Sequence, residues 1–146
     1  MATTTGINVP NAAKTYLDDG DATTCLVVGT AVVGKRFVKA TTGGLGNHPA
    51  VTLAVSGGPI YGVAHFDAAV GANVSVLCEG TIEVTAGETL TSGDEVAVGA
   101  SGVAVKSTAT SQSGTTPFAV TFGLRPVGVC VADTASGAGA PITLYS

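Results

Sequence analysis

The sequence predicts an all-β protein: a single small domain of short strands forming a β-barrel or sandwich, with an extended N-terminal arm. Apolar and polar residues alternate over short segments, which is the period of a strand with one buried face. Turns rich in glycine separate these segments, and the chain of 146 residues has 21 glycines. No segment spaces apolar residues as a helix would over three turns, so helices are not expected.

A short phrase occurs twice with glycine and valine at the same offsets. The first copy starts at Gly71 (Gly-Ala-Asn-Val-Ser-Val) and the second at Gly93 (Gly-Asp-Glu-Val-Ala-Val). Each copy predicts a turn, a strand with alternate valines on one face, a second turn and a return strand, which together make a β-hairpin. A looser version of the phrase follows at 126–133 and 140–145.

The expected elements follow from this pattern in chain order. Residues 1–23 form the N-terminal arm, because they hold Pro10 and the acidic cluster 18–21 and show no sustained periodicity. Residues 24–146 form the β-rich domain. The expected strands are 24–33, 36–40, 51–55, 60–66, 73–78, 81–85, 95–98, 103–107, 118–122, 127–132 and 142–145. Two flexible loops are expected, at 41–49 and at 109–117, and the second is the better candidate for an exposed tip.

Composition narrows the classes of function. Charged residues make up 11% of the chain, against roughly 25% in an average soluble domain, and so little surface charge favours burial in an assembly. The net charge of −4, with six lysines and arginines in all, disfavours nucleic-acid binding. The longest apolar run, 25–33, is well short of the ~18 residues that a membrane span needs. No basic segment precedes an apolar one at the start, so we expect no export signal and synthesis in the cytoplasm.

The cysteines and histidines do not form a metal-binding pattern. Cys25, Cys78 and Cys130 contain no CxxC pair, and two histidines with three scattered cysteines match no zinc spacing. We expect buried, reduced thiols, no metal site and no cofactor.

A catalytic set can be assembled only from separated residues. Cys25 or Cys78 would be the nucleophile, His48 or His65 the base, and Asp67 the residue that orients the base. Since His65 and Asp67 are alternate residues at a strand end, a hydrogen-bonded or solvated pair is expected there. His48 precedes a proline in a glycine-rich loop, so it is interpreted as a loop residue. We therefore expect no catalytic residues and no enzyme.

Charged side chains on the strands are expected to face solvent. Glu83, which alternates with Ile82 and Val84, is placed as a solvent-facing acid. Half of the positive charge lies in one cluster around Phe37, formed by Lys35, Arg36 and Lys39. One interpretation is a solvated strand edge guarded by lysine against edge pairing. The other is a contact patch for an acidic partner surface, with Phe37 as its apolar anchor.

Four runs of the chain closely resemble one known family, the capsid decoration (cement) proteins of tailed bacteriophages, particularly those of actinobacterial hosts. The runs are residues 22–39, 61–76, 85–96 and 126–137. Their distinctive phrases are, in order, Gly-Lys-Arg-Phe-Val, Tyr-Gly-Val-Ala with Asp-Ala-Ala soon after, Gly-x-x-Val-x-Val, and Val-Gly-x-x-Val-x-Asp with a glycine-rich turn. No single phrase decides the resemblance, but their order does.

The resemblance implies a small β-rich head protein without catalytic residues. Such proteins bind the outside of the assembled icosahedral shell, commonly as trimers, and stabilise it against internal DNA pressure. The expected partners are the major capsid protein and further copies of this chain in a homotrimer, with no nucleic acid and no membrane. The expected location is the outer surface of the capsid in the virion. We expect the arm and the basic cluster to supply the contact residues, namely Val9, Pro10, Tyr16, Leu17, Lys35, Arg36, Phe37 and Lys39.

Two alternatives remain open on the sequence alone. The first is a secreted surface or adhesion β-module, against which the missing export signal argues. The second is a small hydrolase that uses Cys25, His48 or His65, and Asp67, in which the catalytic thiol would react quickly with an alkylating reagent.

Overall fold

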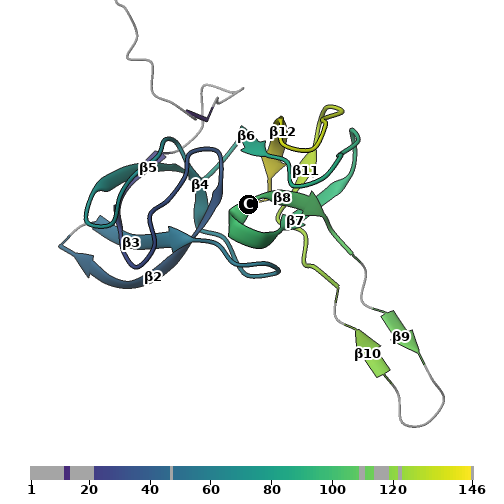
Figure 1. Ribbon diagram of the computed structural model, residues 1–146, viewed down its shortest axis with the longest axis horizontal. Helices are drawn as coiled ribbons and strands as arrows, with labels where there is room; N and C mark the ends of the chain where they lie inside the picture. The colour runs from purple at the N-terminus through teal and green to yellow at the C-terminus, as the bar shows by residue number, and fades with distance from the viewer. Residues whose placement is uncertain are drawn as a thin grey trace, which may run out of the picture.

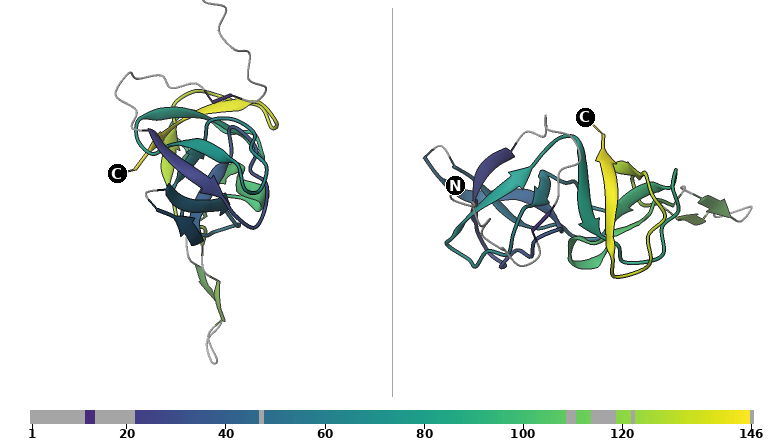
Figure 2. Two further views of the ribbon diagram at one scale, coloured as in Figure 1. Left: turned by 90° about the vertical axis from the view of Figure 1, so that its left-hand side faces the viewer. Right: turned by 90° about the horizontal axis from the view of Figure 1, so that it is seen from above.

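The computed structural model describes residues 12–13, 22–46, 48–108, 111–113, 119–121 and 123–145. These residues are built from strands with a single short 3₁₀ turn, so the all-β prediction is confirmed (Figure 1). The strands fall into two halves that lie side by side, and a two-stranded ribbon projects from the second half (Figure 2).

The first half is a closed barrel of five strands. They are β1 (Ala22–Val27), β2 (Phe37–Leu45), β3 (His48–Leu53), β4 (Gly62–Ala64) and β5 (Asn73–Leu77), in the order β1-β3-β2-β4-β5. The β1–β3 pair is parallel and the other neighbours are antiparallel. Because the barrel is closed, none of its strands is an edge strand.

The second half is a five-stranded sheet. It consists of β6 (Thr81–Thr85), β7 (Glu95–Val98), β8 (Ala104–Lys106), β11 (Gly128–Cys130) and β12 (Gly139–Leu144), in the order β6-β12-β11-β7-β8. The turn η1 (Ala100–Gly102) connects β7 to β8. The projecting ribbon pairs β9 (Ser111–Ser113) with β10 (Ala119–Thr121).

The two halves repeat one topology. In the second sheet the strands neighbour one another in the order β8-β7-β11-β12-β6, and in the barrel the corresponding order is β3-β2-β4-β5-β1. The first to fifth strands of one half therefore occupy the same places as the first to fifth strands of the other. The parallel β1–β3 pair that closes the barrel also has a counterpart, since Ala86 and Ala104 form a parallel bridge between the end of β6 and β8. The chain is therefore two versions of the same five-stranded unit, joined in sequence.

A single turn recurs four times and sets this topology. In each copy, a residue in an isolated β-bridge is followed three positions later by a residue with positive φ, and a strand starts two positions after that. The bridge residue, the positive-φ residue and the strand start are residues 32, 35 and 37 in the first copy, 68, 71 and 73 in the second, 90, 93 and 95 in the third, and 134, 137 and 139 in the fourth. Glycine occupies the positive-φ position in three copies, where a side chain would be strained, and Lys35 (φ 61°) occupies it in the first. Val32 bridges Ala68 within the first half, and Leu90 bridges Thr134 within the second.

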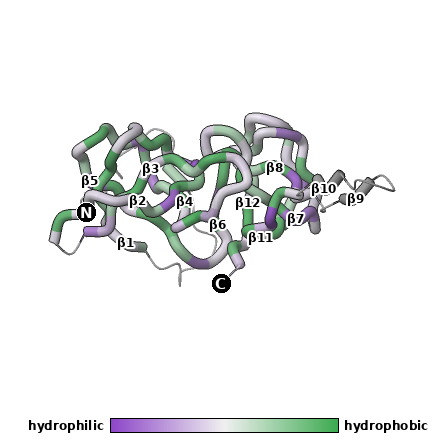
Figure 3. The backbone as a smooth tube through the Cα atoms, turned by 90° about the horizontal axis from the view of Figure 1, so that it is seen from below, coloured by the Kyte–Doolittle hydropathy of each residue, from purple (hydrophilic) through white to green (hydrophobic). Residues whose placement is uncertain are grey.

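Buried apolar residues form two clusters, and hydrophobic segments of the backbone occur in both halves (Figure 3). One is drawn from the barrel alone, with Cys25, Val38 and Val76 among its members. The other joins the two halves, because it combines barrel residues such as Phe37 with residues of the second sheet such as Ile142. A shared core of this kind makes the two units one body.

Three of the local predictions were wrong. Residues 41–49 were expected to be a flexible loop, but β2 runs on to Leu45 and β3 begins at His48, so this segment is the tip of a β-hairpin. The loop expected at 109–117 is contradicted at 111–113, which form β9, and its other residues lie outside the described part of the chain. The phrase at Gly71 predicted that β5 and β6 would pair, but β5 pairs with β1 and β4, and β6 pairs with β12. The phrase at Gly93 predicted a hairpin correctly, because β7 pairs with β8.

Candidate contact site

The candidate contact residues of the arm lie largely outside the described part of the chain. Outside the described part lie all four predicted contacts of the arm, namely Val9, Pro10, Tyr16 and Leu17. Ala13 is described, and it does not lie outside the core as expected of the arm: it is 4% exposed, and its backbone N–H donates to the carbonyl oxygen of His65 at 2.8 Å. A small apolar side chain fits this buried position, so the arm is attached to the barrel at Ala13.

Lys35 joins the two halves. Its N–H donates to Ala64 at 2.9 Å, its carbonyl oxygen accepts from Thr85 of β6 at 2.8 Å, and its ammonium lies 2.5 Å from a carboxylate oxygen of Glu83. The side chain of Lys35 is 25% exposed and that of Glu83 only 10%. The prediction that Glu83 faces solvent was therefore wrong, because this carboxylate turns inward to pair with Lys35 of the other half.

Arg36 makes a second contact between the two halves, next to the Lys35–Glu83 ion pair. Its guanidinium donates from Nη1 to the carbonyl oxygen of Ser101 in η1 at 3.1 Å, and its Nε is buried without a partner in the described structure. At Gly102 any Cβ would fall on the backbone of Phe37, so the turn η1 packs directly against this segment. Arg36 is thus used within the chain.

Phe37 is not a surface anchor. Its side chain is 0% exposed and belongs to the core cluster that joins the two halves. Phe37 opens β2, and the alternation of the strand turns its ring toward the second sheet instead of toward solvent. The proposed role of Phe37 as an exposed anchor is therefore contradicted.

Lys39 is the member of the cluster that remains available to a partner. It is half-buried on β2, opposite Thr52 of β3, and has no ion pair within the described structure. The interpretation as a guarded strand edge was wrong, since β2 lies between β3 and β4 in the closed barrel. Of the three cations in the cluster, only Lys39 has neither an ion pair nor a side-chain hydrogen bond within the described residues.

A groove lies between the two halves, and no pattern in the sequence indicated it. Its volume is about 620 Å³, and it is lined by Gly57, Gly58, Pro59, Ile60, Arg125, Pro126, Val127 and Tyr145. The loop after β3 and the segment before β11 occupy equivalent places in the two halves. The N–H of Tyr61 donates to the carbonyl oxygen of Val38 in β2, and the N–H of Val127 donates to that of Val96 in the equivalent strand β7, both at 2.7 Å. The groove therefore forms where equivalent segments of the two halves meet.

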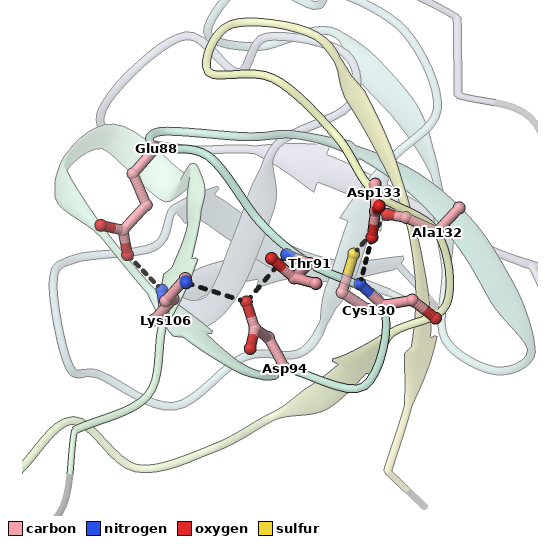
Figure 4. Close-up of polar contacts among 8 residues, drawn as sticks. Glu88, Thr91, Asp94, Lys106, Cys130, Ala132 and Asp133 are labelled. Carbon is pink, nitrogen blue, oxygen red and sulfur yellow. Dashed lines mark hydrogen bonds and ion pairs between the residues drawn. The ribbon is translucent and has the colours of Figure 1, made fainter.

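Asp67, the residue expected to orient a catalytic histidine, instead closes a turn. Its carboxylate accepts from the N–H of Gly34 at 2.8 Å. Asp133, at the equivalent place in the second half, accepts from the N–H of Ser92 at 2.9 Å (Figure 4). The nearby ring of His65 packs against Phe66. Two matching carboxylates in matching turns indicate a structural role for Asp67.

None of the three described cysteines forms a disulfide, and Cys25 is not activated. Cys25 and Cys130 are buried, as expected, whereas Cys78 is only half-buried. Burial, with a smaller effect of Cys78, raises the pKa of Cys25 to about 11. A thiol with this pKa stays protonated near neutral pH, the opposite of a catalytic thiolate.

Alkylation of the native protein with iodoacetamide near pH 8 is expected to modify Cys78 first. Cys25 and Cys130 should react only after denaturant unfolds the chain, because both are enclosed by the core. Peptide mass mapping over time measures this order. Rapid modification of Cys25 in the folded protein would restore the hydrolase alternative.

The carboxylate of Asp94 is expected to make the stability of the protein depend on pH. The N–H of Thr91 donates to its carboxylate at 2.8 Å, and Lys106 lies 3.1 Å away (Figure 4). These contacts, the backbone hydrogen bond first, lower the pKa of Asp94. Because folding lowers this pKa, the stabilisation is complete above the pKa of the unfolded chain, ~3.9, and is lost as pH falls through the lower folded-state value.

Asp94→Asn is therefore expected to be less stable than the wild type at neutral pH, with a difference that shrinks as the pH falls from about 5 to about 2. Urea unfolding at several pH values measures the difference. A gap that stays constant over this range would show that the carboxylate charge does not contribute.

Neither a metal centre nor a membrane helix is found in the part of the chain that the structure describes. No group of three metal-ligating side chains comes together there. No helix in the same residues has the length and apolar character to span a membrane.

The polar contacts described above close turns and join the two β units. A family model described as phage cement protein matches residues 17–143. The chain therefore belongs to the phage cement protein family, and the predicted resemblance is confirmed. No curated protein matches the chain.

Among solved structures, the chain is similar to the N base of the head fiber protein gp8.5 of bacteriophage phi29. The two share 17% sequence identity with a TM-score of 0.63, over 86% of this chain and 93% of that one. At this identity the similarity concerns the fold. The topology described above is thus also found in a protein of a phage head fiber.

Proposed function

We propose that this protein is a capsid decoration subunit that binds the major capsid protein on the outside of the assembled phage head and stabilises the head. The observation that carries the proposal is the family match over residues 17–143. Low surface charge and two β units fused through a shared core suit a rigid subunit that covers a lattice. The protein would be made in the host cytoplasm and would reach its place by docking on the outer surface of the virion.

Within this proposal, residues 24–146 form the decoration domain, residues 1–23 the arm, and Lys39 the charged contact of the barrel. Lys35 and Arg36, which were also proposed as contacts, already bind Glu83 and Ser101 of the second half. Any contribution of these two residues to binding would therefore be indirect, through the contact between the two halves. Val9 and Pro10 precede Ala13, where the arm is attached to the barrel. We also propose that the protein assembles as a homotrimer.

Sedimentation with empty heads that lack this protein tests the proposal. The wild type should co-sediment with the heads and should raise the temperature at which they rupture. Lys39→Glu should weaken binding and reduce its salt dependence, whereas Lys39→Arg keeps the charge and should bind as the wild type does. Failure of the wild type to bind intact heads at any salt concentration would refute the decoration role.

Truncation tests the arm separately. Removing residues 1–11 leaves the attachment at Ala13 intact, so the truncated chain should fold normally and decorate poorly. Unchanged affinity for empty heads would show that these residues do not contact the shell.

A further inference from the structure

The groove between the two halves combines an apolar floor with a cation that has no partner within the described structure. Ile60 and Val127 form the floor and pack against the core cluster that joins the halves. Tyr145 is half exposed beside them, and its hydroxyl lies 3.2 Å from the carboxylate of Glu95, which can hold the ring against the groove. Arg125 is exposed at the same groove. The groove would therefore suit an apolar segment followed directly by acids.

Arg125 stands out among the cations in the described part of the chain. Lys35 pairs with Glu83, Lys106 pairs with Asp94, and Arg36 donates to a carbonyl oxygen. Among the cations of the described residues, only Arg125 and Lys39 have neither an ion pair nor a side-chain hydrogen bond, and of these two only Arg125 lines the groove. An acidic ligand of the groove would therefore meet an uncompensated positive charge.

The chain itself contains a segment with the complementary order. Tyr16 and Leu17 are followed at once by Asp18, Asp19 and Asp21, which are three of the ten acids in the chain. This stretch lies between Ala13, which is bonded to His65, and β1, so it is tethered to the barrel at both ends.

We propose that the groove of one copy binds the segment 16–21 of a neighbouring copy, with Tyr16 and Leu17 over the apolar floor and the aspartates at Arg125. This proposal deepens the self-association proposed above by naming its contact. A groove on one copy and a segment on the next make a heterologous contact, which closes into a ring when the rotation between copies allows. Binding through a groove and an exposed charge makes association sensitive to salt.

Charge reversal and its rescue test this contact. Sedimentation velocity over a concentration series should show self-association of the wild type. Arg125→Glu should weaken it at least about tenfold, and so should Asp18→Lys combined with Asp19→Lys. The triple variant Arg125→Glu, Asp18→Lys, Asp19→Lys should recover most of the loss, because the charges again oppose each other. Lys39→Glu is the matched control, since it reverses the other unpaired cation away from the groove and should leave self-association unchanged.

The outcomes separate this inference from the proposed function. Circular dichroism confirms that each variant is folded, as expected for changes at an exposed arginine. Wild-type association that persists in Arg125→Glu, or a triple variant without recovery, overturns the contact. A wild type that stays monomeric at every concentration also overturns it, yet the same protein can still decorate heads in the sedimentation assay. Loss of head binding in Arg125→Glu with self-association unchanged would assign the groove to the shell protein instead.

Discussion

Phe37→Ala is expected to lower the free energy of unfolding by about 3–5 kcal/mol, which is the range for removing a fully buried phenylalanine. The ring of Phe37 is 0% exposed and lies in the cluster that joins the two halves. Its removal leaves a cavity at the junction, where the turn η1 packs directly against the backbone of Phe37. Urea unfolding followed by circular dichroism measures the loss.

Phe66→Ala is the matched control for this prediction. Phe66 is only partly buried, against the cluster of the barrel, so its truncation should cost clearly less. If Phe37→Ala left stability nearly unchanged and abolished binding to heads, Phe37 would be a contact residue after all.

Lys35→Met is expected to lower the free energy of unfolding by about 2–3 kcal/mol, because it leaves the buried carboxylate of Glu83 without a partner. We place the loss below the usual 3–5 kcal/mol for breaking a buried pair because the lysine side chain is 25% exposed. The double variant Lys35→Met, Glu83→Gln should be more stable than the sum of the single losses predicts, since neither member then leaves an isolated charge.

A second ion pair provides the comparison. Lys106→Met breaks the pair with Asp94, whose partners are 47% and 29% exposed, so the loss should be much smaller. Equal losses at the two sites would show that the joint at Lys35 is no stronger than a surface contact.

The sequence predicted the fold class and most strands, because short alternating segments and glycine turns are local signals. Residues 95–98 and 81–85 were expected as strands and form β7 and β6 with these bounds. The pairing of strands was less predictable. The phrase at Gly71 places a strand correctly, but this strand pairs with β1, which is remote in sequence, and with the preceding strand β4 instead of the following strand β6. No local pattern selects these partners.

The repeat was visible in the sequence only in part. Gly71 and Gly93 belong to two copies of the recurrent turn that are adjacent in the chain but lie in different halves. The first copy has Lys35 where the others have glycine, so the glycine phrase does not reveal it. The backbone geometry shared by the four copies shows the duplication, and backbone geometry tolerates sequence change.

The candidate site was the least predictable part. Charge alone identified the cluster around Phe37, but whether a lysine faces solvent or a buried acid depends on what packs against it. Glu83, which pairs with Lys35, lies on β6 in the other half. The groove at Arg125 is formed by segments far apart in sequence and has no local signature.

The most direct test of the decoration role is a cryo-EM map of heads that lack this protein, recorded before and after the purified chain is added. We predict new density at regular positions on the outer surface of the shell, with the barrel and the second sheet both recognisable in it. Heads whose outer surface is unchanged after saturating addition of folded protein, or density confined to the inside of the shell, would contradict the role of a cement protein.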